Sequence, residues 1–357
     1  MNRLTKYLLR LVLPIAIFCH ASEALATPAG PCPGPIFVQS FDDATATVCP
    51  RPKARFDYFG SYATSFGVLS SSGAGQPITW TIASNGGSPG SISVQFGSPA
   101  SNGIAEADFD GDGKFDVAVY DISVGGFSYL PSSGGAAITI PWSSNPATDF
   151  YSAVGDYDCD GKADPTYVRD VGGNMQWVIK TSGPGPDRMV TFGVSTTDNA
   201  LPGMDWNGDG CDDLGTVRTE SGGAMTWRIG DASNGTLLLQ HALGNRNTDF
   251  IIPGDYLGDE RADFAVWRSY GAGTSGQWLI EENGGAGTLS QVFGTPGDFA
   301  VRDVALRGDF DGDGKDDIAV KKKGSAIWQW RRSSDGVIDQ TTVGSPNNFP
   351  IPATGIQ

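Results

Sequence analysis

The sequence predicts an all-β fold, a β-propeller of about six four-stranded blades with aspartate-rich hairpin loops. Two observations predict it: an aspartate-rich loop returns about every 50 residues, and the same series of short strands and turns follows each copy. The composition agrees, because 50 glycines and 22 prolines in 357 residues are typical of many short strands joined by turns. Beyond the N-terminus no long segment has apolar residues at helical spacing.

Residues 1–26 have the pattern of a secretory signal peptide. Arg3 and Lys6 give a positive start, residues 8–18 form a short apolar core, and Ala24-Leu25-Ala26 forms a cleavage site. The apolar run is too short to cross a bilayer comfortably, and no later segment is expected to cross one. We therefore expect cleavage near Ala26 and a mature chain that is secreted, periplasmic or held at the cell surface.

Export places the cysteines in an oxidising compartment. With Cys19 removed, four remain: Cys32, Cys49, Cys159 and Cys211. A Cys32–Cys49 disulfide within the N-terminal segment is the favoured pairing. Cys159 and Cys211 lie in two successive loops, where they either bridge neighbouring repeats or stay as free thiols.

The best-preserved loop is Asp108–Asp116, with carboxylates at positions 1, 3, 5 and 9 and glycine at position 6. Alternate residues of a tight loop point inward, so four oxygens can converge on one hard cation, and position 7 can add its backbone carbonyl. Calcium fits such a set, because it takes six to eight oxygen ligands and tolerates irregular geometry. An EF-hand would also need Glu at position 12 and flanking helices, whereas position 12 here is Val119 in an apparent strand.

Copies of this loop begin at residues 57, 108, 156, 205, 255 and 309. The copies at 108, 156, 205 and 309 are complete. In the copy at 205, Asn207 takes position 3 as a neutral oxygen donor. The copy at 255 has Leu257 at position 3 and Glu260 at position 6, and the copy at 57 has lost nearly every ligand. A near-constant period of this size indicates stacked or radial copies of one unit.

Each loop is followed by the same signals. An apolar strand comes first, at residues 66–69, 117–120, 166–168, 264–267 and 318–320. After a Gly/Ser turn comes an aromatic residue that we expect in the core between blades: Trp80, Tyr129, Trp177, Trp227, Trp278 or Trp330. A further strand then ends in Phe-Gly or a relative, at residues 96–97, 192–193, 243–244, 293–294 and 343–344. About four short strands per 50 residues match one propeller blade.

An N-terminal segment, residues 27–56, precedes the repeats at 57–357, and its residues 36–56 resemble the closing strands of a preceding unit. A ring must hide its edge strands. The segment is therefore expected either to help close the ring with C-terminal strands or to begin a partial seventh blade. Six blades is the preferred prediction and seven is the alternative.

The Asp-x-Asp-x-Asp-Gly-x-x-Asp loop, the apolar strand after it and the Phe-Gly ending resemble the FG-GAP/VCBS-type repeat over residues 57–357. That repeat occurs in integrin α-subunit propellers and in many secreted bacterial proteins. The resemblance implies about four calcium ions, or five with the copy at 255, held in hairpin loops at one rim, with position 7 contributing its backbone carbonyl. The implied ligands are Asp108, Asp110, Asp112, Lys114 and Asp116; Asp156, Asp158, Asp160, Lys162 and Asp164; Asp205, Asn207, Asp209, Cys211 and Asp213; Asp309, Asp311, Asp313, Lys315 and Asp317; and, more weakly, Asp255, Asp259, Arg261 and Asp263.

Composition also bounds the function. The formal charge of −16 argues against nucleic acid as a partner. The mature chain has the single histidine His241, so it lacks a second imidazole for a metal cluster or proton relay, and no residue set points to catalysis. Trp142, Trp206 and Tyr270 fall outside the repeated aromatic pattern and are candidates for surface recognition, and Lys321–Lys323 is expected to be a solvated turn.

The sequence therefore predicts an exported, monomeric calcium-binding propeller that acts as a binding or adhesion module for a surface glycan or protein. Calcium is expected to be mainly a structural staple. Two alternatives stay open: a calcium-dependent polysaccharide-degrading enzyme, either a lyase or a hydrolase, and a purely structural envelope protein.

Overall fold

The computed structural model describes residues 55–73, 76–85, 90–98, 102–105, 107–121, 126–141, 149–183, 186–268, 276–295 and 303–351. The chain divides into two compact units, Met1–Cys49 and Pro50–Gln357, and every described residue belongs to the second. The expected signal peptide at 1–26 and the expected Cys32–Cys49 disulfide lie outside the described residues. So do Trp142 and Tyr270.

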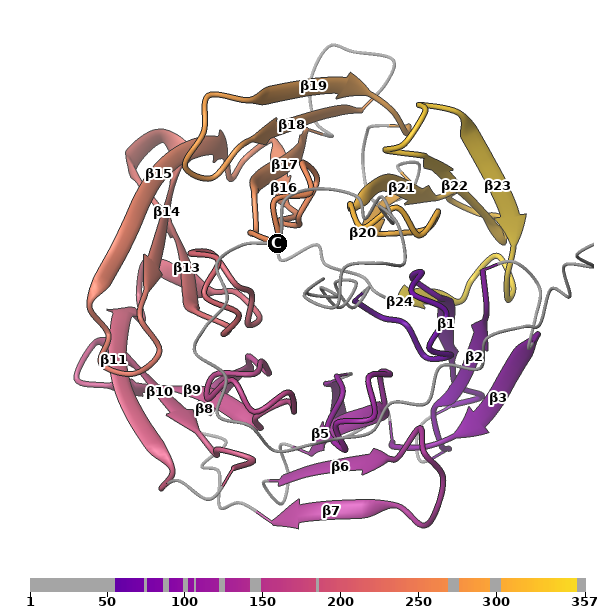
Figure 1. Ribbon diagram of the computed structural model, residues 1–357, viewed down its shortest axis with the longest axis horizontal. Coiled ribbons are helices and arrows are strands. Elements are labelled where there is room, and N and C mark those ends of the chain that lie inside the picture. The colour runs from indigo at the N-terminus through magenta and orange to yellow at the C-terminus, as the bar shows by residue number, and fades with distance from the viewer. Residues whose placement is uncertain are drawn as a thin grey trace, which may run out of the picture. The chain divides into compact units, whose positions relative to one another are not determined.

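Six four-stranded antiparallel sheets make up the described part of the second unit and stand as blades around a ring (Figure 1). This confirms the predicted β-propeller and its preferred six blades. Blade 1 has the strand order β24-β1-β2-β3, and blades 2 to 6 each take four consecutive strands. In every blade an innermost strand is followed outward by a second, a third and an outer strand.

The strands are grouped here by their place in the blade. The innermost strands are β24 (Phe349–Ile351), β4 (Asn102–Ile104), β8 (Asp149–Ser152), β12 (Asp198–Ala200), β16 (Asp249–Ile251) and β20 (Val304–Gly308). The second strands are β1 (Phe66–Ser70), β5 (Val117–Asp121), β9 (Thr166–Val171), β13 (Leu214–Thr219), β17 (Phe264–Arg268) and β21 (Asp317–Lys321). The third strands are β2 (Thr79–Ala83), β6 (Gly126–Leu130), β10 (Asn174–Ile179), β14 (Ala224–Gly230), β18 (Gln277–Glu281) and β22 (Ile327–Arg331). The outer strands are β3 (Ser91–Gln95), β7 (Ile138–Pro141), β11 (Arg188–Val194), β15 (Leu237–Asn245), β19 (Thr288–Val292) and β23 (Ile338–Thr342). A short 3-10 turn, η1 (Ser221–Gly223), precedes β14.

Burial changes along each blade with distance from the centre of the ring. The second strand β17 is buried at its first four residues, which explains the continuous apolar runs after the loops, because residues on both of its faces are covered. The outer strand β19 alternates between exposed and half-buried residues. The period of two in such strands arises because successive side chains point to opposite faces.

The C-terminal strand closes the ring. β24 pairs antiparallel with β1, with Gly67 opposite Ile351 and Leu69 opposite Phe349. Gly67 allows this close approach, because a methyl group there would lie 2.5 Å from Ile351 Cγ1. Blade 1 thus combines strands from both ends of the repeat region. Of residues 36–56, which were expected to close or extend the ring, 36–54 lie outside the described residues.

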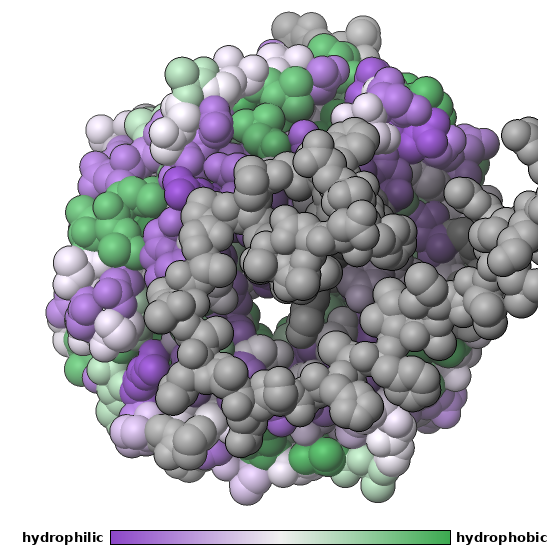
Figure 2. All heavy atoms as spheres, viewed as in Figure 1, coloured by the Kyte–Doolittle hydropathy of each residue, from purple (hydrophilic) through white to green (hydrophobic). Residues whose placement is uncertain are grey.

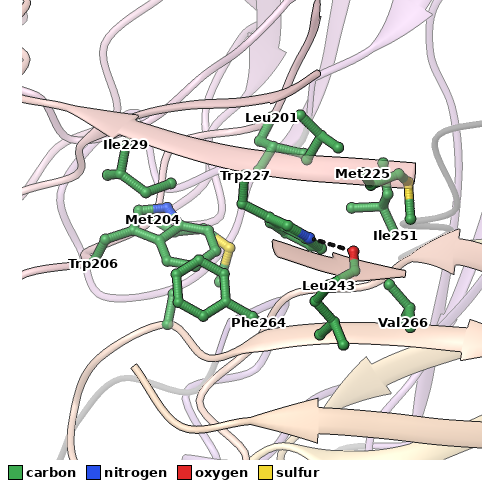
Figure 3. Close-up of a cluster of buried hydrophobic side chains, with 12 residues drawn as sticks. Leu201, Met204, Trp206, Met225, Trp227, Ile229, Leu243, Ile251, Phe264 and Val266 are labelled. Carbon is green, nitrogen blue, oxygen red and sulfur yellow. Dashed lines mark hydrogen bonds between the residues drawn. The ribbon is translucent and has the colours of Figure 1, made fainter. Parts of the chain in front are cut away.

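A tryptophan in the third strand organises the core of most blades. In blade 4, Trp227 packs against Trp206 and Phe264 and donates its Nε1–H to the carbonyl of Leu243 at 3.0 Å (Figure 3). The acceptor is the residue before the glycine of the Phe-Gly ending, so this bond ties the third strand to the end of the outer strand. The same bond occurs in the pairs Trp80–Phe96, Trp177–Phe192 and Trp278–Phe293. These four tryptophans are fully buried, as predicted.

Strand register corrects the predicted alignment of two blades. Pairing with the second strand places Phe127 and Trp328, and not Tyr129 and Trp330, at the register that Trp278 holds in blade 5. Tyr129 and Trp330 lie two residues further along and are still buried, because residues two apart in a strand share a face. The hairpins before these strands differ in length, so spacing along the chain did not reveal the register.

Trp206 is buried, with 1% of its surface exposed, so its predicted role in surface recognition is wrong. It occupies position 2 of its loop, where its ring packs against Trp227 in the core. Position 2 holds a buried aromatic in every copy of the loop: Tyr58, Phe109, Tyr157, Trp206, Tyr256 and Phe310. This recurring aromatic was the sequence signal for burial.

Lys321 is also buried, at 4% exposure in β21, so the prediction of a solvated turn is wrong for this residue. Its Nζ donates to the carbonyls of Ser325 at 2.9 Å and Pro346 at 3.3 Å, which satisfies the buried ammonium group. Lys322 is half-buried, with its Nζ 2.6 Å from Asp303 Oδ2, and Lys323 is exposed.

Exposed apolar side chains lie mainly on the outer strands. Each outer strand presents at least one of them: Ile92, Ile138, Met189, Leu237, Val292 and Ile338. On the face seen in Figure 2 the hydrophobic residues form separate patches around the circumference with hydrophilic residues between them. Within the described ranges, no helix has the length and hydropathy needed to span a membrane.

Candidate metal loops

Six nine-residue loops form a closed circle at one rim of the propeller, numbered here by blade as loop 1 (57–65), loop 2 (108–116), loop 3 (156–164), loop 4 (205–213), loop 5 (255–263) and loop 6 (309–317). Position 8 of each loop donates its backbone N–H to the position-1 carbonyl of the preceding loop. The bonds are Phe115 to Asp57, Ala163 to Asp108, Asp212 to Asp156, Ala262 to Asp205, Asp316 to Asp255 and Thr64 to Asp309, at 2.6–2.8 Å. The last bond joins loop 1 to loop 6, so even the degenerate loop 1 keeps its place in the circle.

Carboxylates converge in three of these loops. In loops 2, 3 and 6 the aspartates at positions 1, 3 and 9 bring one oxygen each to within 4.8 Å of the others. These sets are Asp108, Asp110 and Asp116; Asp156, Asp158 and Asp164; and Asp309, Asp311 and Asp317. The convergence repeats the same three positions on three blades, as expected if it is a property of the repeat.

The position-1 carboxylate is held by the backbone of its own loop. Asp108 accepts the N–H of Gly111 on Oδ1 at 2.7 Å and the N–H of Gly113 on Oδ2 at 2.8 Å. Both glycines have a positive φ, near 80° and 87°, which a residue with a Cβ rarely adopts. The glycines at positions 4 and 6 therefore let the loop wrap around the first aspartate.

The position-9 carboxylate is fully buried and joins three parts of the blade. Asp116 Oδ2 accepts the N–H of Phe109 at 2.8 Å, and its Oδ1 accepts the N–H of Ser132, which lies just after the third strand, at 2.6 Å. Ser132 Oγ in turn donates to Asp112 at 2.8 Å, and Ser133 Oγ donates to Asp110 at 2.5 Å.

The same serine contacts recur at Ser182 in blade 3 and at Ser333 and Ser334 in blade 6. Sequence reasoning missed these serines. Their signal was a Ser-Ser or Ser-Gly pair at the same turn in exactly those blades whose loops carry converging aspartates.

Position 5 lies outside the converging sets. Asp112 Oδ1 accepts the N–H of Lys114 at 2.9 Å, and its Oδ2 lies 3.2 Å from Lys114 Nζ. The corresponding carboxylates bind the position-7 N–H in loops 3, 4 and 6: Asp160 to Lys162, Asp209 to Cys211 and Asp313 to Lys315. Of the predicted ligands, the structure thus brings together positions 1, 3 and 9, and it directs position 5 at the loop backbone.

Burial makes the ionised form of these carboxylates unfavourable unless a cation compensates their charge. Burial, aided by the neighbouring carboxylates Asp110 and Asp108, raises the pKa of Asp116 to about 6. Burial likewise raises the pKa of Asp164 to about 7 and that of Asp317 to about 8. A buried carboxyl group with a raised pKa holds its proton near neutral pH unless a cation replaces it.

Loop 4 has the same frame with a neutral residue at position 3. Asp205 accepts the N–H groups of Gly208 and Gly210, and buried Asp213 accepts that of Trp206. Asn207 Nδ2 donates to Asp213 Oδ1 at 3.3 Å. An amide that donates to the position-9 carboxylate must turn over to present its oxygen to a cation, so loop 4 is less prepared for a metal than loops 2, 3 and 6.

Loop 5 departs further from the pattern. Asp255 accepts from the backbone as in the other loops, and Asp263 accepts the N–H groups of Tyr256 and Leu257. Leu257 offers no side-chain oxygen at position 3, and Asp259 accepts from the N–H of Arg261. Two carboxylates, at positions 1 and 9, are then left to face a cation.

A disulfide joins Cys159 of loop 3 to Cys211 of loop 4, with their Cα atoms 4.9 Å apart. Of the two alternatives that the sequence left open for these residues, the structure therefore has the bridge between neighbouring repeats.

The other end of the innermost strand carries a second repeated contact that sequence reasoning missed. Buried Asp198 receives the guanidinium of Arg218 at 2.7 and 3.0 Å and also accepts the N–H of Val194 from the preceding blade. Equivalent pairs are Asp149–Arg169, Asp249–Arg268 and Asp303–Lys322. The Asp that recurs at or just before the start of the innermost strand in blades 3 to 6 was the available signal. Each ion pair joins two strands of one blade, and the N–H groups of Val194, Asn245 and Thr295 link the carboxylates of Asp198, Asp249 and Asp303 to the preceding blade.

The donor set in loops 2, 3, 4 and 6 fits a hard cation. All candidate side-chain ligands are carboxylate or amide oxygens, which calcium and magnesium prefer over softer metals. The loops are irregular and anchored by backbone N–H groups, an arrangement that suits the variable geometry of calcium better than the strict octahedron of magnesium.

No protein-family model matches the chain, and no curated protein matches it. Among solved structures, the chain is similar to TolB from Acinetobacter baumannii, with a TM-score of 0.50, 14% identity, and coverage of 80% of this chain and 64% of TolB. The chain therefore spans less than two thirds of that protein. The Tc holotoxin pore of Photorhabdus luminescens carrying the TccC3-D651A mutation matches with a TM-score of 0.42 and 15% identity, over 75% of this chain and 13% of that one. At these identities the likeness to TolB supports the propeller fold and nothing finer.

Proposed function

We propose that this chain is an exported β-propeller whose loops 2, 3, 4 and 6 each bind a calcium ion, with loop 5 as a weaker fifth site, like the FG-GAP/VCBS-type repeats it resembles. The observation that carries the proposal is the convergence of the position 1, 3 and 9 carboxylates in three blades. Turn-capping aspartates alone would not require three buried or half-buried carboxylates to share one small volume on every such blade. The position-5 carboxylate and the position-7 carbonyl would complete the ligand set.

Calcium in these loops would act mainly as a structural staple. Each loop leads into the buried second strand of its blade and is hydrogen-bonded to the next loop in the circle. An ion there would neutralise the carboxylates whose burial raises their pKa. With the millimolar affinity typical of extracellular modules and a few millimolar calcium, each site would contribute roughly 1–2 kcal/mol of stability.

The propeller itself is proposed to be a binding or adhesion module for a surface glycan or protein in the periplasm, at the cell surface or outside the cell. Its support is architectural, because a rigid ring presents loops in fixed positions, which suits recognition. The likeness to TolB supports the same rigid frame. A calcium-dependent polysaccharide-degrading enzyme and a structural envelope protein are the competing outcomes.

Elemental analysis and thermal unfolding test the calcium proposal. We expect about four bound calcium ions per chain after equilibrium dialysis against a few millimolar calcium, a melting temperature that falls in EDTA, and recovery with calcium. Asp110→Ala, Asp158→Ala and Asp311→Ala remove the position-3 oxygen and should each lose one ion, whereas Asp339→Ala makes the same change in the outer strand β23 and should lose none. An absence of calcium together with an EDTA-insensitive melt would refute the proposal.

Glycan arrays and a panel of polysaccharides test the module. Binding without turnover, reduced by chelation, is the expected result. Release of shortened or unsaturated oligosaccharides would instead establish a polysaccharide-degrading enzyme. Neither binding nor turnover in these assays would favour a structural envelope protein.

A further inference from the structure

Neighbouring loops overlap in a fixed way, with position 7 of one loop lying across position 4 of the preceding loop. A methyl group on Gly111 would lie 2.9 Å from Lys162 Cε, and one on Gly258 would lie 2.7 Å from Lys315 Cε. The same overlap joins Gly60 to Lys114 and Gly208 to Arg261. At these junctions the flexible stem of a basic residue therefore lies directly against the position-4 glycine.

The junction of loops 3 and 4 replaces this overlap with a covalent bond. Cys159 stands at position 4 of loop 3 and Cys211 at position 7 of loop 4, and the two form the disulfide. Cys159 has φ of 65°, the left-handed conformation that glycine adopts at position 4 of the other five loops: Gly60, Gly111, Gly208, Gly258 and Gly312. A residue with a Cβ is disfavoured in this conformation, so the disulfide holds Cys159 where a free cysteine would tend to relax.

Candidate cation ligands flank Cys159, and the neighbour of Cys211 holds a further one. Cys159 is flanked by Asp158 and Asp160 of loop 3. Next to Cys211, Asp212 donates its N–H to the carbonyl of Asp156 at 2.8 Å, and its Oδ2 accepts the N–H of Asp156, also at 2.8 Å. The disulfide therefore fixes the residue that positions Asp156 and also fixes the turn that carries Asp158.

We propose that the Cys159–Cys211 disulfide is a redox-sensitive lock on the cation sites of loops 3 and 4. The inference rests on the proposed calcium binding. A dithiol reductant exchanges with the disulfide, so that the dithiol becomes a cyclic disulfide and Cys159 and Cys211 each gain one hydrogen as thiols. Cys159 is exposed and Cys211 is half-buried, which gives the reductant access.

Reduction releases Cys159 from the left-handed conformation and frees loop 4 to move away from loop 3. The flanking aspartates then lose their shared orientation, and calcium binds more weakly at both loops. Linkage requires the converse, because a ligand that prefers the oxidised form shifts the thiol–disulfide equilibrium toward that form by the same factor. The loops at the other junctions have no disulfide and stay unaffected.

Calorimetric titration of the full chain with calcium alone tests the lock. Asp110→Ala with Asp311→Ala removes the sites of loops 2 and 6 and isolates loops 3 and 4, and Asp158→Ala with Asp213→Asn does the reverse. Dithiothreitol should weaken calcium binding in the first background by about fivefold or more, the lower end of typical coupling between sites. In the second background it should leave the affinity unchanged. Thiol counting reports the extent of reduction in each sample.

Two cysteine variants separate the lock from a general loss of folding. Cys159→Gly with Cys211→Lys rebuilds the glycine–lysine overlap of the other junctions, so it should bind calcium as oxidised protein does and ignore the reductant. Cys159→Ser with Cys211→Ser keeps a side chain at the left-handed position without the bond and should match the reduced protein. Equal affinity of reduced and oxidised protein would overturn the lock alone, whereas no calcium binding by the oxidised protein would overturn both this inference and the proposed function.

Discussion

Replacing the core tryptophan of blade 4 by phenylalanine tests the bond that ties its third strand to its outer strand. Trp227 is fully buried, and its Nε1–H donates to Leu243 O at 3.0 Å. Trp328 holds the same register in blade 6 and is just as buried, but its Nε1 has no hydrogen-bond partner among the residues that the structure describes. Trp227→Phe and Trp328→Phe therefore form a matched pair that differs in one hydrogen bond.

The two variants share the cost of a smaller ring in a close-packed core, roughly 1–3 kcal/mol each by comparison with larger truncations. Trp227→Phe also leaves the carbonyl of Leu243 buried without its donor, which costs about 1–3 kcal/mol. Trp328→Phe removes an unpaired buried N–H and carries no such cost. Trp227→Phe should thus lose about 2 kcal/mol more of the free energy of unfolding.

Urea unfolding followed by far-ultraviolet circular dichroism measures the difference, with calcium held at one concentration for both variants. A loss that agrees between the two variants within about 0.5 kcal/mol, the usual error of such comparisons, would refute the assigned role of the hydrogen bond. A change in the denaturant slope would instead indicate that unfolding is no longer comparable between them.

Three further predictions concern the loops, a glycine of the outer strand β15, and the closure of the ring. In EDTA the free energy of unfolding should fall as pH rises from about 4 to 8, because folded Asp164 and Asp317, with pKa values of about 7 and 8, hold protons that the unfolded chain releases near pH 4. The stability that calcium adds should grow over the same pH range. Melting temperatures at pH 5, 6, 7 and 8, with and without calcium, check both directions. Gly244→Ala should lower the free energy of unfolding by at least about 2 kcal/mol, because φ is 90° and the methyl group would lie 2.5 Å from Met225 Cε. The control Gly222→Ala has φ of 80° and nothing within 4 Å, so it should show only the backbone cost of about 1–2 kcal/mol. Urea unfolding measures both. Ending the chain at Asn348 removes β24 and should expose the β1 amides that it covers, so fast hydrogen exchange in β1 is expected, and unchanged protection would contradict closure by this strand.

Much of this fold could be predicted because each blade repeats the same local rules. The loop aspartates mark the entry to the second strand, and the apolar run that follows is buried on both faces in the structure, as in β17. Six copies at one period then imply a ring. The tryptophan of the third strand was also recognisable, since a large aromatic in an alternating strand must be covered.

The errors arose where chain spacing is a poor guide to register or environment. Tyr129 and Trp330 are buried as predicted, but they lie two residues beyond the register that Trp278 holds, because the preceding hairpins differ in length. Lys321 looked like part of a charged turn, but the strand continues through it and two carbonyl groups receive its ammonium. No local pattern reports such distant acceptors.

The candidate site was predictable in its ligands but not in its supporting shell. The carboxylates at positions 1, 3 and 9 are visible in the sequence because the loop repeats them. Ser132 contacts Asp116, and Arg218 contacts Asp198, across at least 16 residues of sequence, and a single residue of such a common type carries no distinctive signal. Their signal is repetition, which becomes visible only when the blades are aligned with one another.

Closure of the ring by β24 also sets the order of folding. The strand that completes blade 1 pairs with β1 across roughly 280 residues, the most distant strand pairing in the described part of the chain. At a synthesis rate of about 5–20 residues per second, β1 waits roughly 15–60 s before its partner exists. During that interval its edge is open to other chains. Blades 2 to 6 each consist of consecutive strands, so they can form before β24 is made. Blade 1 contains β24 as well as β1, so the ring can close only after β24 has been synthesised.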